Sequence, residues 1–310
     1  MPALITHHLF GEDVLPELPA GLVEGEEELL AFLLGNQGPD PLFARFSTLP
    51  SRALTCRRLA RKIHAGRMTR AFFSLRDGVS RLPAADERIG RAFAFGVLGH
   101  YALDRAAHPF VIWQQRALVE TDPSLAGAEQ EIHAIIESDI DSWILWEKRH
   151  ATVEERPAES NLMRTPRTER VAGALVSQTA LSVFGIELGA HEYGAAVHDY
   201  ERLYRAIDPA GRKLVRAAGM AERRFRTHSY AQASAHHVRR TDECPAANLA
   251  CLPWTDPFTG ARRTESFADL YDEARLTYPV LAEAFVRGDE TRLRELVACL
   301  NYEGRPVTDA

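Results

Sequence analysis

Hydrophobic residues recur along this chain at the spacing of α-helices. In most segments the apolar positions fall three or four residues apart, which places them on one face of a helix. We find neither convincing alternating strand patterns nor an internal repeat, so the sequence predicts an all-α fold, a multi-helix bundle. The periodicity predicts helices over residues 26–34, 52–75, 86–107, 129–146, 168–184, 193–206, 209–235, 266–286 and 290–299.

Prolines set the expected ends of two of these helices. Pro109 is expected to end the helix over 86–107, because the residue before a proline avoids the helical region. This places His108 at the C-terminal edge of that helix. Asp208 and Pro209 are expected to cap and open a later helix.

Polar segments separate the predicted helices without dividing the chain into distinct domains. Residues 151–166 are polar and contain proline, which indicates a loop, and residues 241–265 have no period, which indicates a long irregular connection. We therefore expect a single all-α domain over residues 1–310. Residues 1–150 hold most of the candidate ligands, and residues 167–310 are expected to form a second layer or a lid over them.

Composition narrows the class of protein only slightly. The chain has 45% hydrophobic and 26% charged residues and a formal net charge of −6, which disfavours a general nucleic-acid binder. There is no basic leader before an apolar run and no stretch of about 18 apolar residues, so we expect a cytoplasmic protein without a transmembrane segment.

The cysteines carry little information about function. They lack CxxC spacing and are expected to be free, buried thiols of a reducing compartment, although Cys244 and Cys251 could pair in an oxidising one. The four are Cys56, Cys244, Cys251 and Cys299.

Two of the apolar helices carry metal-ligand side chains at four-residue intervals. His100, Asp104 and His108 follow one another in GVLGHYALDRAAHPFV, and His133 and Glu137 repeat the spacing in EIHAIIESDIDSW. Residues four apart lie on one face of a helix, so two helices can present these groups to a shared space. Imidazole and carboxylate groups suit zinc, and burying so many ionisable groups without a metal would be costly.

Further candidate ligands lie near these helices or outside them. His7 and His8 stand in ALITHHLFG, Asp40 stands in GPDP, and His64 stands in RKIHAGRMTR. Asp141 extends the stripe of His133 and Glu137 by one more turn. Taken singly, His7, His8, Asp40 and His64 are each more often surface residues than ligands.

The order of the motifs resembles a known family. THxxFG, NxGPDP, a following histidine, HYxLDRxAHP and HxxxExxID resemble the zinc-dependent phospholipase C family, in particular its non-secreted bacterial branch. The resemblance covers about the first half of the chain. It implies an all-α bundle that holds three zinc ions, a fold and ligand plan shared with single-strand-specific zinc nucleases.

Carried over residue by residue, the resemblance assigns the ligands to separate zinc ions. Asp104 would serve twice, as a ligand of the first ion and as a bridge to a third ion, which secreted members complete with their N-terminal amine and carbonyl. We therefore expect two or three zinc ions. The first would be held by Asp40, His64, His100 and Asp104, the second by His108, His133 and Glu137, and the third by Asp104 and His7.

The activity implied by the resemblance is phosphoester hydrolysis. Zinc lowers the pKa of a bound water toward neutrality and so supplies hydroxide. We predict a zinc-dependent phosphodiesterase of the phospholipase C type, acting on a phospholipid or a related phosphodiester, with Asp40 as general base or as a ligand alone. The alternatives are a nuclease or phosphomonoesterase on the same cluster, or a non-catalytic metal-binding protein.

Basic runs suggest where anions bind. Residues 52–70 carry seven Arg and Lys residues and no acid; this is typical of a solvated helix face, but it also attracts phosphate or the anionic surface of a membrane. Arg67 and Arg105 are candidates for substrate binding. We expect peripheral membrane contact, no nucleic-acid partner, and an exposed second basic run over residues 222–240 that includes His236.

Overall fold

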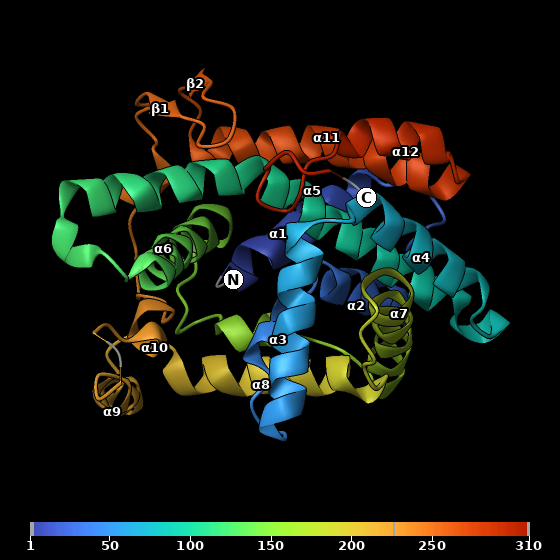
Figure 1. The fold of residues 1–310 in the computed structure, drawn as a ribbon, viewed down its shortest axis with the longest axis horizontal. Coiled ribbons are helices and arrows are strands. Elements are labelled where there is room, and N and C mark those ends of the chain that lie inside the picture. Colours follow the sequence, from blue (N-terminus) through green and yellow to red (C-terminus); the bar gives the residue numbers. More distant parts are fainter. Residues whose placement is uncertain (1–2, 226, 309–310) are drawn as a thin grey trace. The chain divides into compact units, whose positions relative to one another are not determined.

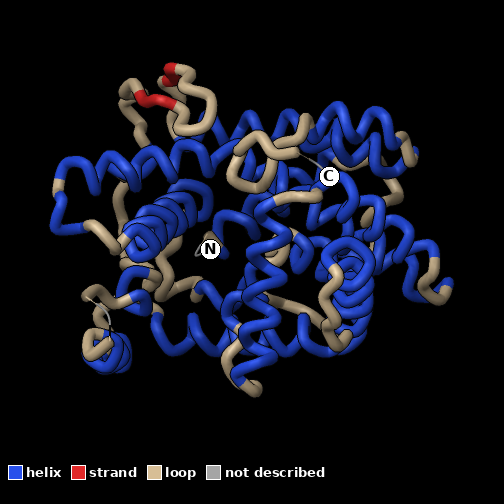
Figure 2. The backbone as a smooth tube through the Cα atoms, in the orientation of Figure 1, coloured by secondary structure: helices blue, strands red, loops and turns tan. Residues whose placement is uncertain are grey.

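The computed structural model describes residues 3–225 and 227–308, and within them almost all regular structure is helical (Figures 1 and 2). The prediction of an all-α, multi-helix fold is confirmed. The helices are α1 Leu4–Val14, α2 Glu26–Gly35, α3 Pro50–Ala65, α4 Met68–Ser80, α5 Ala84–Thr121, α6 Glu129–Arg149, α7 Pro166–Phe184, α8 His191–Ile207, α9 Lys213–Glu222, α10 Tyr230–Ala233, α11 Phe267–Arg287 and α12 Glu290–Val297.

The described residues form two compact units, each assembled from segments far apart in sequence. The first unit combines the segment ending at Leu9 with Ala107–Asn161 and Glu201–Leu270. The second unit combines Phe10–Ala106 and Leu162–Tyr200 with the segment that begins at Tyr271. Each unit draws on both halves of the sequence. The single-domain organisation, with a lid formed by the second half, stays a prediction.

The helix expected over residues 52–75 is two helices. α3 ends at Ala65 and α4 begins at Met68, and between them Arg67 adopts the left-handed conformation with φ of 68°. The Arg67 guanidinium donates a hydrogen bond to the carbonyl oxygen of Val183 at 2.5 Å. This contact with a residue distant in sequence supports a break that the helical period does not reveal.

The prediction that Pro109 ends its helix is wrong. α5 continues through Pro109 to Thr121, so His108 lies inside the helix. A proline in a helix interior costs about 3 kcal/mol, because it removes one backbone hydrogen bond and crowds the preceding turn. Phe110 is fully buried against Trp254, with ring centroids 5.3 Å apart, and burial of such side chains offsets that cost.

The helix expected over residues 209–235 is also interrupted, and Asp208 does not cap it. α9 begins only at Lys213, and α10 is a separate short helix. The Asp208 carboxylate instead accepts hydrogen bonds from the backbone N–H of His236 at 2.9 Å and from its Nδ1 at 2.6 Å. Asp208, the expected N-cap residue, therefore binds His236, which is distant in sequence, instead of capping the helix.

The two segments expected to be irregular contain little regular structure. Residues 151–166 hold one short 3-10 turn. Residues 241–265 contain a second such turn and a minimal antiparallel pair, β1 Trp254–Thr255 with β2 Arg262–Arg263, which the sequence analysis did not anticipate. Trp254 is buried against Phe110 and Trp113 and anchors this segment to α5.

All four cysteines are free, but Cys251 and Cys299 are exposed, so the prediction of buried thiols is wrong for these two. Among the described residues, no helix has both the length and the apolarity needed to cross a bilayer.

Close contact between α2 and α5 organises the second unit. Gly35 and Gly96 face each other's backbone: a Cβ added to Gly96 would lie 2.1 Å from the carbonyl oxygen of Phe32, and one added to Gly35 would lie 2.2 Å from that of Phe93. Only glycine permits this approach. It brings the C-terminal end of α2 against the turn of α5 that precedes the candidate ligand His100.

We expect Gly96→Ala to lower the free energy of unfolding by about 1–3 kcal/mol or more, because the new methyl group must displace backbone. Gly66→Ala is the matched control: an added Cβ there meets nothing within 4 Å and φ is 172°, so a change below about 0.5 kcal/mol is expected. Urea denaturation followed by circular dichroism measures both. If the two variants have the same free energy of unfolding, the close approach of Gly96 to the backbone of α2 does not limit stability, and this expectation is wrong.

Candidate metal centres

Four of the predicted ligands meet in the second unit, and we name them the four-residue cluster: Asp40, His64, His100 and Asp104. Nε2 of His64 lies 3.2 Å from Oδ1 of Asp40 and 3.8 Å from Oδ2 of Asp104. Nε2 of His100 lies 3.2 Å from the same Asp104 oxygen. Two ligand atoms bound to one ion at about 2.1 Å lie roughly 3.4 Å apart in a tetrahedral site, so these spacings match a shared ion.

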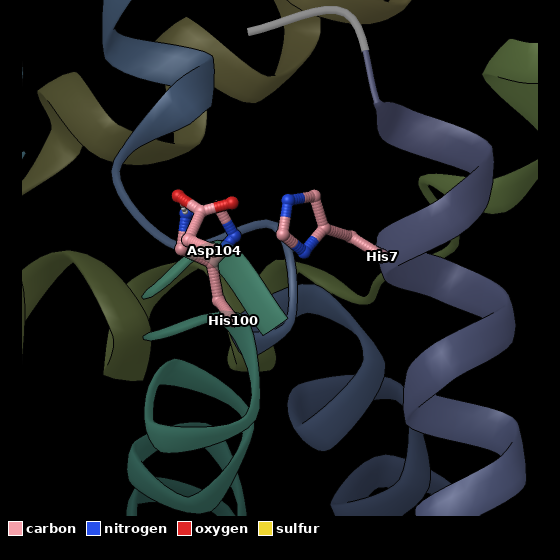
Figure 3. A group of neighbouring side chains, drawn as sticks. All are labelled: His7, His100 and Asp104. Carbon is pink, nitrogen blue, oxygen red and sulfur yellow. Dashed lines mark ion pairs between the residues drawn. The ribbon is translucent and has the colours of Figure 1, made fainter. Parts of the chain in front are cut away.

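Separate elements bring these ligands together. Asp40 opens the 3-10 helix η2 (Asp40–Ala44), which packs against α3, and His64 lies in the last turn of α3. His100 and Asp104 project from successive turns of α5 (Figure 3). The i, i+4 pair is local, whereas its meeting with Asp40 and His64 depends on packing within the unit.

Both histidines of the cluster are oriented by backbone carbonyl groups. Nδ1 of His64 lies 2.8 Å from the carbonyl oxygen of Ala60, and Nδ1 of His100 lies 3.0 Å from that of Asn36. A ring nitrogen that faces a carbonyl carries the proton, so Nε2 is left to face the carboxylates or a cation. Metal-binding histidines are commonly held in this way.

Arg45 anchors the far end of the segment that carries Asp40. Its guanidinium Nε lies 2.9 Å from Glu192, and its Nη1 lies 2.5 Å from Asp199, both in α8. Asp199 also accepts the backbone N–H groups of Phe46 and Ser47. This buried network holds residues 45–47 on α8 and so restricts where the preceding η2 can lie.

Buried charge in the four-residue cluster is paired. Burial alone would raise the pKa of the Asp40 carboxyl, but the hydrogen bond from His64 and the charge of His100 lower it to about 2. Burial would likewise lower the pKa of His100, yet Asp104 beside it raises that pKa above the ordinary value. The Asp40 carboxylate therefore stays ionised at neutral pH, as a ligand of a cation must be.

Tyr302 closes one side of this cluster, and sequence reasoning missed it. Its ring centroid lies 5.0 Å from that of His64 and 5.6 Å from that of His100, and its side chain is buried. No spacing rule links residue 302 to either histidine. Only the packing of the C-terminal segment brings it to the site.

A second group, the three-residue cluster, lies in the first unit and consists of His108, His133 and Glu137. Nε2 of His108 and Nε2 of His133 lie 3.4 and 3.2 Å from Oε1 of Glu137. The two rings stack with centroids 5.5 Å apart. Nδ1 of His133 lies 3.2 Å from Oε1 of Gln115, which orients this ring as the carbonyl groups orient the others.

Glu137 is the shared acceptor of the three-residue cluster. Its side chain is buried, and burial alone would raise the pKa of its carboxyl. The neighbouring His133 and His108 nevertheless hold this pKa well below the usual value. The cluster therefore offers one ionised carboxylate and two imidazole nitrogens, and it is able to hold a metal ion.

The remaining candidates lie in different surroundings. Arg67 donates to the carbonyl oxygen of Val183, and Arg105 donates to that of Leu296 at 2.7 Å while lying over the ring of Tyr101, so both guanidinium groups already serve the fold. Their role in substrate binding stays a prediction.

His7 and His8 are buried and belong to the first unit. Figure 3 draws the His7 side chain on α1. Asp104 belongs to the second unit, and Met1 and Pro2 lie outside the described residues. The third zinc ion, which the resemblance assigns to His7 and Asp104, therefore stays a prediction.

A cavity in the second unit lies apart from the ligands. It has a volume of about 430 Å³ and lies between α3, α7 and the start of α8. Arg52, Ser177 and Glu192 are among its lining residues, and none of the four-residue cluster is. Its presence therefore adds nothing to the metal hypothesis.

Asp141 and His236 form a different buried group in the first unit. The prediction that His236 is exposed is wrong: it is fully buried between Asp141 and Asp208, with Nε2 3.0 Å from Asp141 and Nδ1 2.6 Å from Asp208. Asp141 also accepts the backbone N–H groups of Ile5 and Thr6 at 2.9 and 2.8 Å. It therefore caps the first turn of α1 instead of joining the metal ligands.

His236 carries a charge that the two carboxylates stabilise. Burial alone would lower the pKa of its imidazole, but Asp208 and Asp141 raise that pKa to about 10. The ordinary value is 6.5. Its stabilising contribution is therefore fully present below pH 6.5 and is lost as the pH rises through about 10.

We expect His236→Gln to destabilise the protein by about 3–5 kcal/mol near neutral pH, since it leaves two buried carboxylates without their cation. The difference from the unsubstituted protein should shrink toward pH 10, by up to about 1.4 kcal/mol per pH unit. Urea denaturation at several pH values measures it, with the exposed His237→Gln as the control. A difference that stays constant with pH would contradict a charged His236.

Comparison with protein-family models, curated proteins and solved structures finds no match to this chain. Membership of the phospholipase C family therefore stays a prediction that rests on the motifs. The two ligand clusters are defined by distances between side chains within each unit, so they do not depend on that resemblance.

Proposed function

We propose that this protein is a zinc-dependent phosphoester hydrolase of the phospholipase C type. The observation that carries the proposal is that seven residues taken from the motifs gather into two compact, buried or half-buried sets of imidazole and carboxylate groups. The order of the motifs supports a phospholipid or a related phosphodiester as substrate. The cytoplasmic location expected from the sequence belongs to the same proposal.

The donor sets of the two clusters suit zinc in different ways. Two histidines and two aspartates in the four-residue cluster can fill a tetrahedral zinc site. Two histidines and one glutamate in the three-residue cluster match the ligand set of catalytic zinc sites, which leave one position for water or substrate. The open position is the feature that favours catalysis.

The chain's own residues supply orientation and a proton acceptor. When bound, zinc activates water and neutralises charge that develops on the phosphoryl oxygens. Ala60, Asn36 and Gln115 fix the tautomers and directions of the ligating rings. Asp40 comes from η2, a different element from the α5 ligands that it joins, and either completes the donor set or accepts the proton of the attacking water.

A non-catalytic metal-binding protein is the second candidate, and the four-residue cluster favours it. A closed set of four protein ligands is typical of structural zinc. Under this hypothesis the metal contributes to folding, and phosphoesters are not cleaved. A nuclease on the same ligands is disfavoured by the net charge of −6.

We expect about two zinc ions per chain by mass spectrometry of protein purified without chelator, one for each donor set. Asp104→Asn and Glu137→Gln should each remove about one of them, because each loses an ionised ligand. Asp139→Asn is the matched control, since Asp139 lies on α6 beside Glu137 but pairs with Arg239. A folded protein without stoichiometric metal would contradict both metal hypotheses.

We expect the protein to hydrolyse a phosphodiester such as bis(p-nitrophenyl) phosphate or a phospholipid, and a chelator to abolish this activity. Asp40→Asn separates the two roles of that residue. If Asp40 acts only as a general base, this variant keeps its metal and its rate falls about 10²–10⁴-fold. If Asp40 is a metal ligand, the variant loses metal as well. If the protein holds its full complement of metal but hydrolyses neither phosphodiesters nor phosphomonoesters, the hydrolase proposal is wrong and a non-catalytic metal-binding protein is supported instead.

A further inference from the structure

Helix α9 presents an apolar face to solvent. Its inner face carries Val215 and Gly219, which are buried, and it packs beside α10 (Figure 1). On the outer face, the side chains of Leu214 and Met220 are 60% and 68% exposed, and Phe225, just beyond the helix, is 90% exposed. The exposed Ala217 and Ala221 continue this outer face at the i+3 and i+7 positions from Leu214.

Cations surround these apolar side chains. Within residues 211–225 the only acid is Glu222, and its carboxylate accepts hydrogen bonds from Oγ of Ser229 at 2.6 Å and from the backbone N–H of Ala231 at 3.1 Å. The positive charges are therefore not balanced locally, in a chain whose net charge is −6. The exposed cations are Arg212, Lys213, Arg216, Arg223 and Arg224.

Exposed apolar side chains surrounded by cations fit some kinds of partner better than others. A nucleic acid would use the cations but would leave the aliphatic side chains of Leu214 and Met220 in water. A second copy of the chain would bury the apolar face but would bring ten like charges together, five from each copy. An anionic bilayer uses both features, because apolar side chains enter the headgroup region while Lys and Arg meet lipid phosphates and carboxylates.

We propose that α9 and the following residues 223–225 form a membrane-docking element for anionic bilayers. Leu214, Met220 and Phe225 insert into the headgroup boundary, and the five cations bind the charged surface. This element lies in the first unit and is separate in sequence from the basic run over 52–70. Binding requires neither metal nor hydrolysis, so its test does not depend on the proposed function.

The test is co-sedimentation of the full chain with phosphatidylcholine vesicles that contain or lack phosphatidylserine. We expect binding to the anionic vesicles that weakens as salt is added. Arg216→Ala with Arg224→Ala should weaken it about 30-fold, because each cation near such a surface is worth about 1 kcal/mol. Met220→Ser and Phe225→Ser should each weaken it roughly tenfold.

Control substitutions on two other helices test whether vesicle binding is specific to α9. Leu276→Ser removes a side chain that is 78% exposed on α11, and Arg58→Ala with Arg61→Ala removes two exposed cations of α3. These controls should bind as the unsubstituted protein does. The proposal is overturned by absent binding, by equal binding to both vesicle types, or by a loss that appears only in the α3 variant. It is also overturned if the α9 substitutions act on self-association or on nucleic-acid binding instead.

Discussion

Buried carboxylates need a partner of opposite charge, and this constraint shapes both units. Taking an ionised carboxylate out of water is costly unless a cation or several N–H groups replace the water. In the second unit, Asp199 and Glu192 are paired with Arg45. In the first unit, Asp141 and Asp208 are paired with His236. Each pairing joins segments that are far apart in sequence.

The two ligand clusters differ from these structural pairs in the nature of the cation. Arg45 is permanently charged, and His236 is held in its charged form by two carboxylates, so neither group has a place for a metal ion. In the four-residue cluster, by contrast, each histidine directs Nδ1 at a carbonyl group and Nε2 at a carboxylate. A metal ion can take the place of the proton on Nε2 without disturbing the backbone contact that holds the ring. This difference separates a candidate metal centre from an ion pair that only stabilises the fold.

Continuity of α5 through Pro109 determines which ligands this helix can supply. Because burial of the residues around the proline offsets its cost, His100, Asp104 and His108 stay on one helix at four-residue intervals. His108 then joins His133 and Glu137, while His100 and Asp104 join ligands of the second unit. One uninterrupted helix thus contributes to both donor sets. The exposed apolar side chains of α9 are independent of this arrangement, and they carry the proposed contact with an anionic bilayer.

The sequence by itself determined the helical class and the local ligand stripes, because an i, i+4 interval has the same meaning in any helix. It did not determine the break at Arg67, the passage of α5 through Pro109, or the burial of His236. Each of these depends on contacts with residues distant in sequence, and the spacing of apolar residues along a helix does not reveal such contacts. Motif order suggested that Asp40 and His64 join the α5 ligands. Only the tertiary structure places them there, because the close approach at Gly96 and the packing of η2 on α3 set distances that no spacing along the chain encodes.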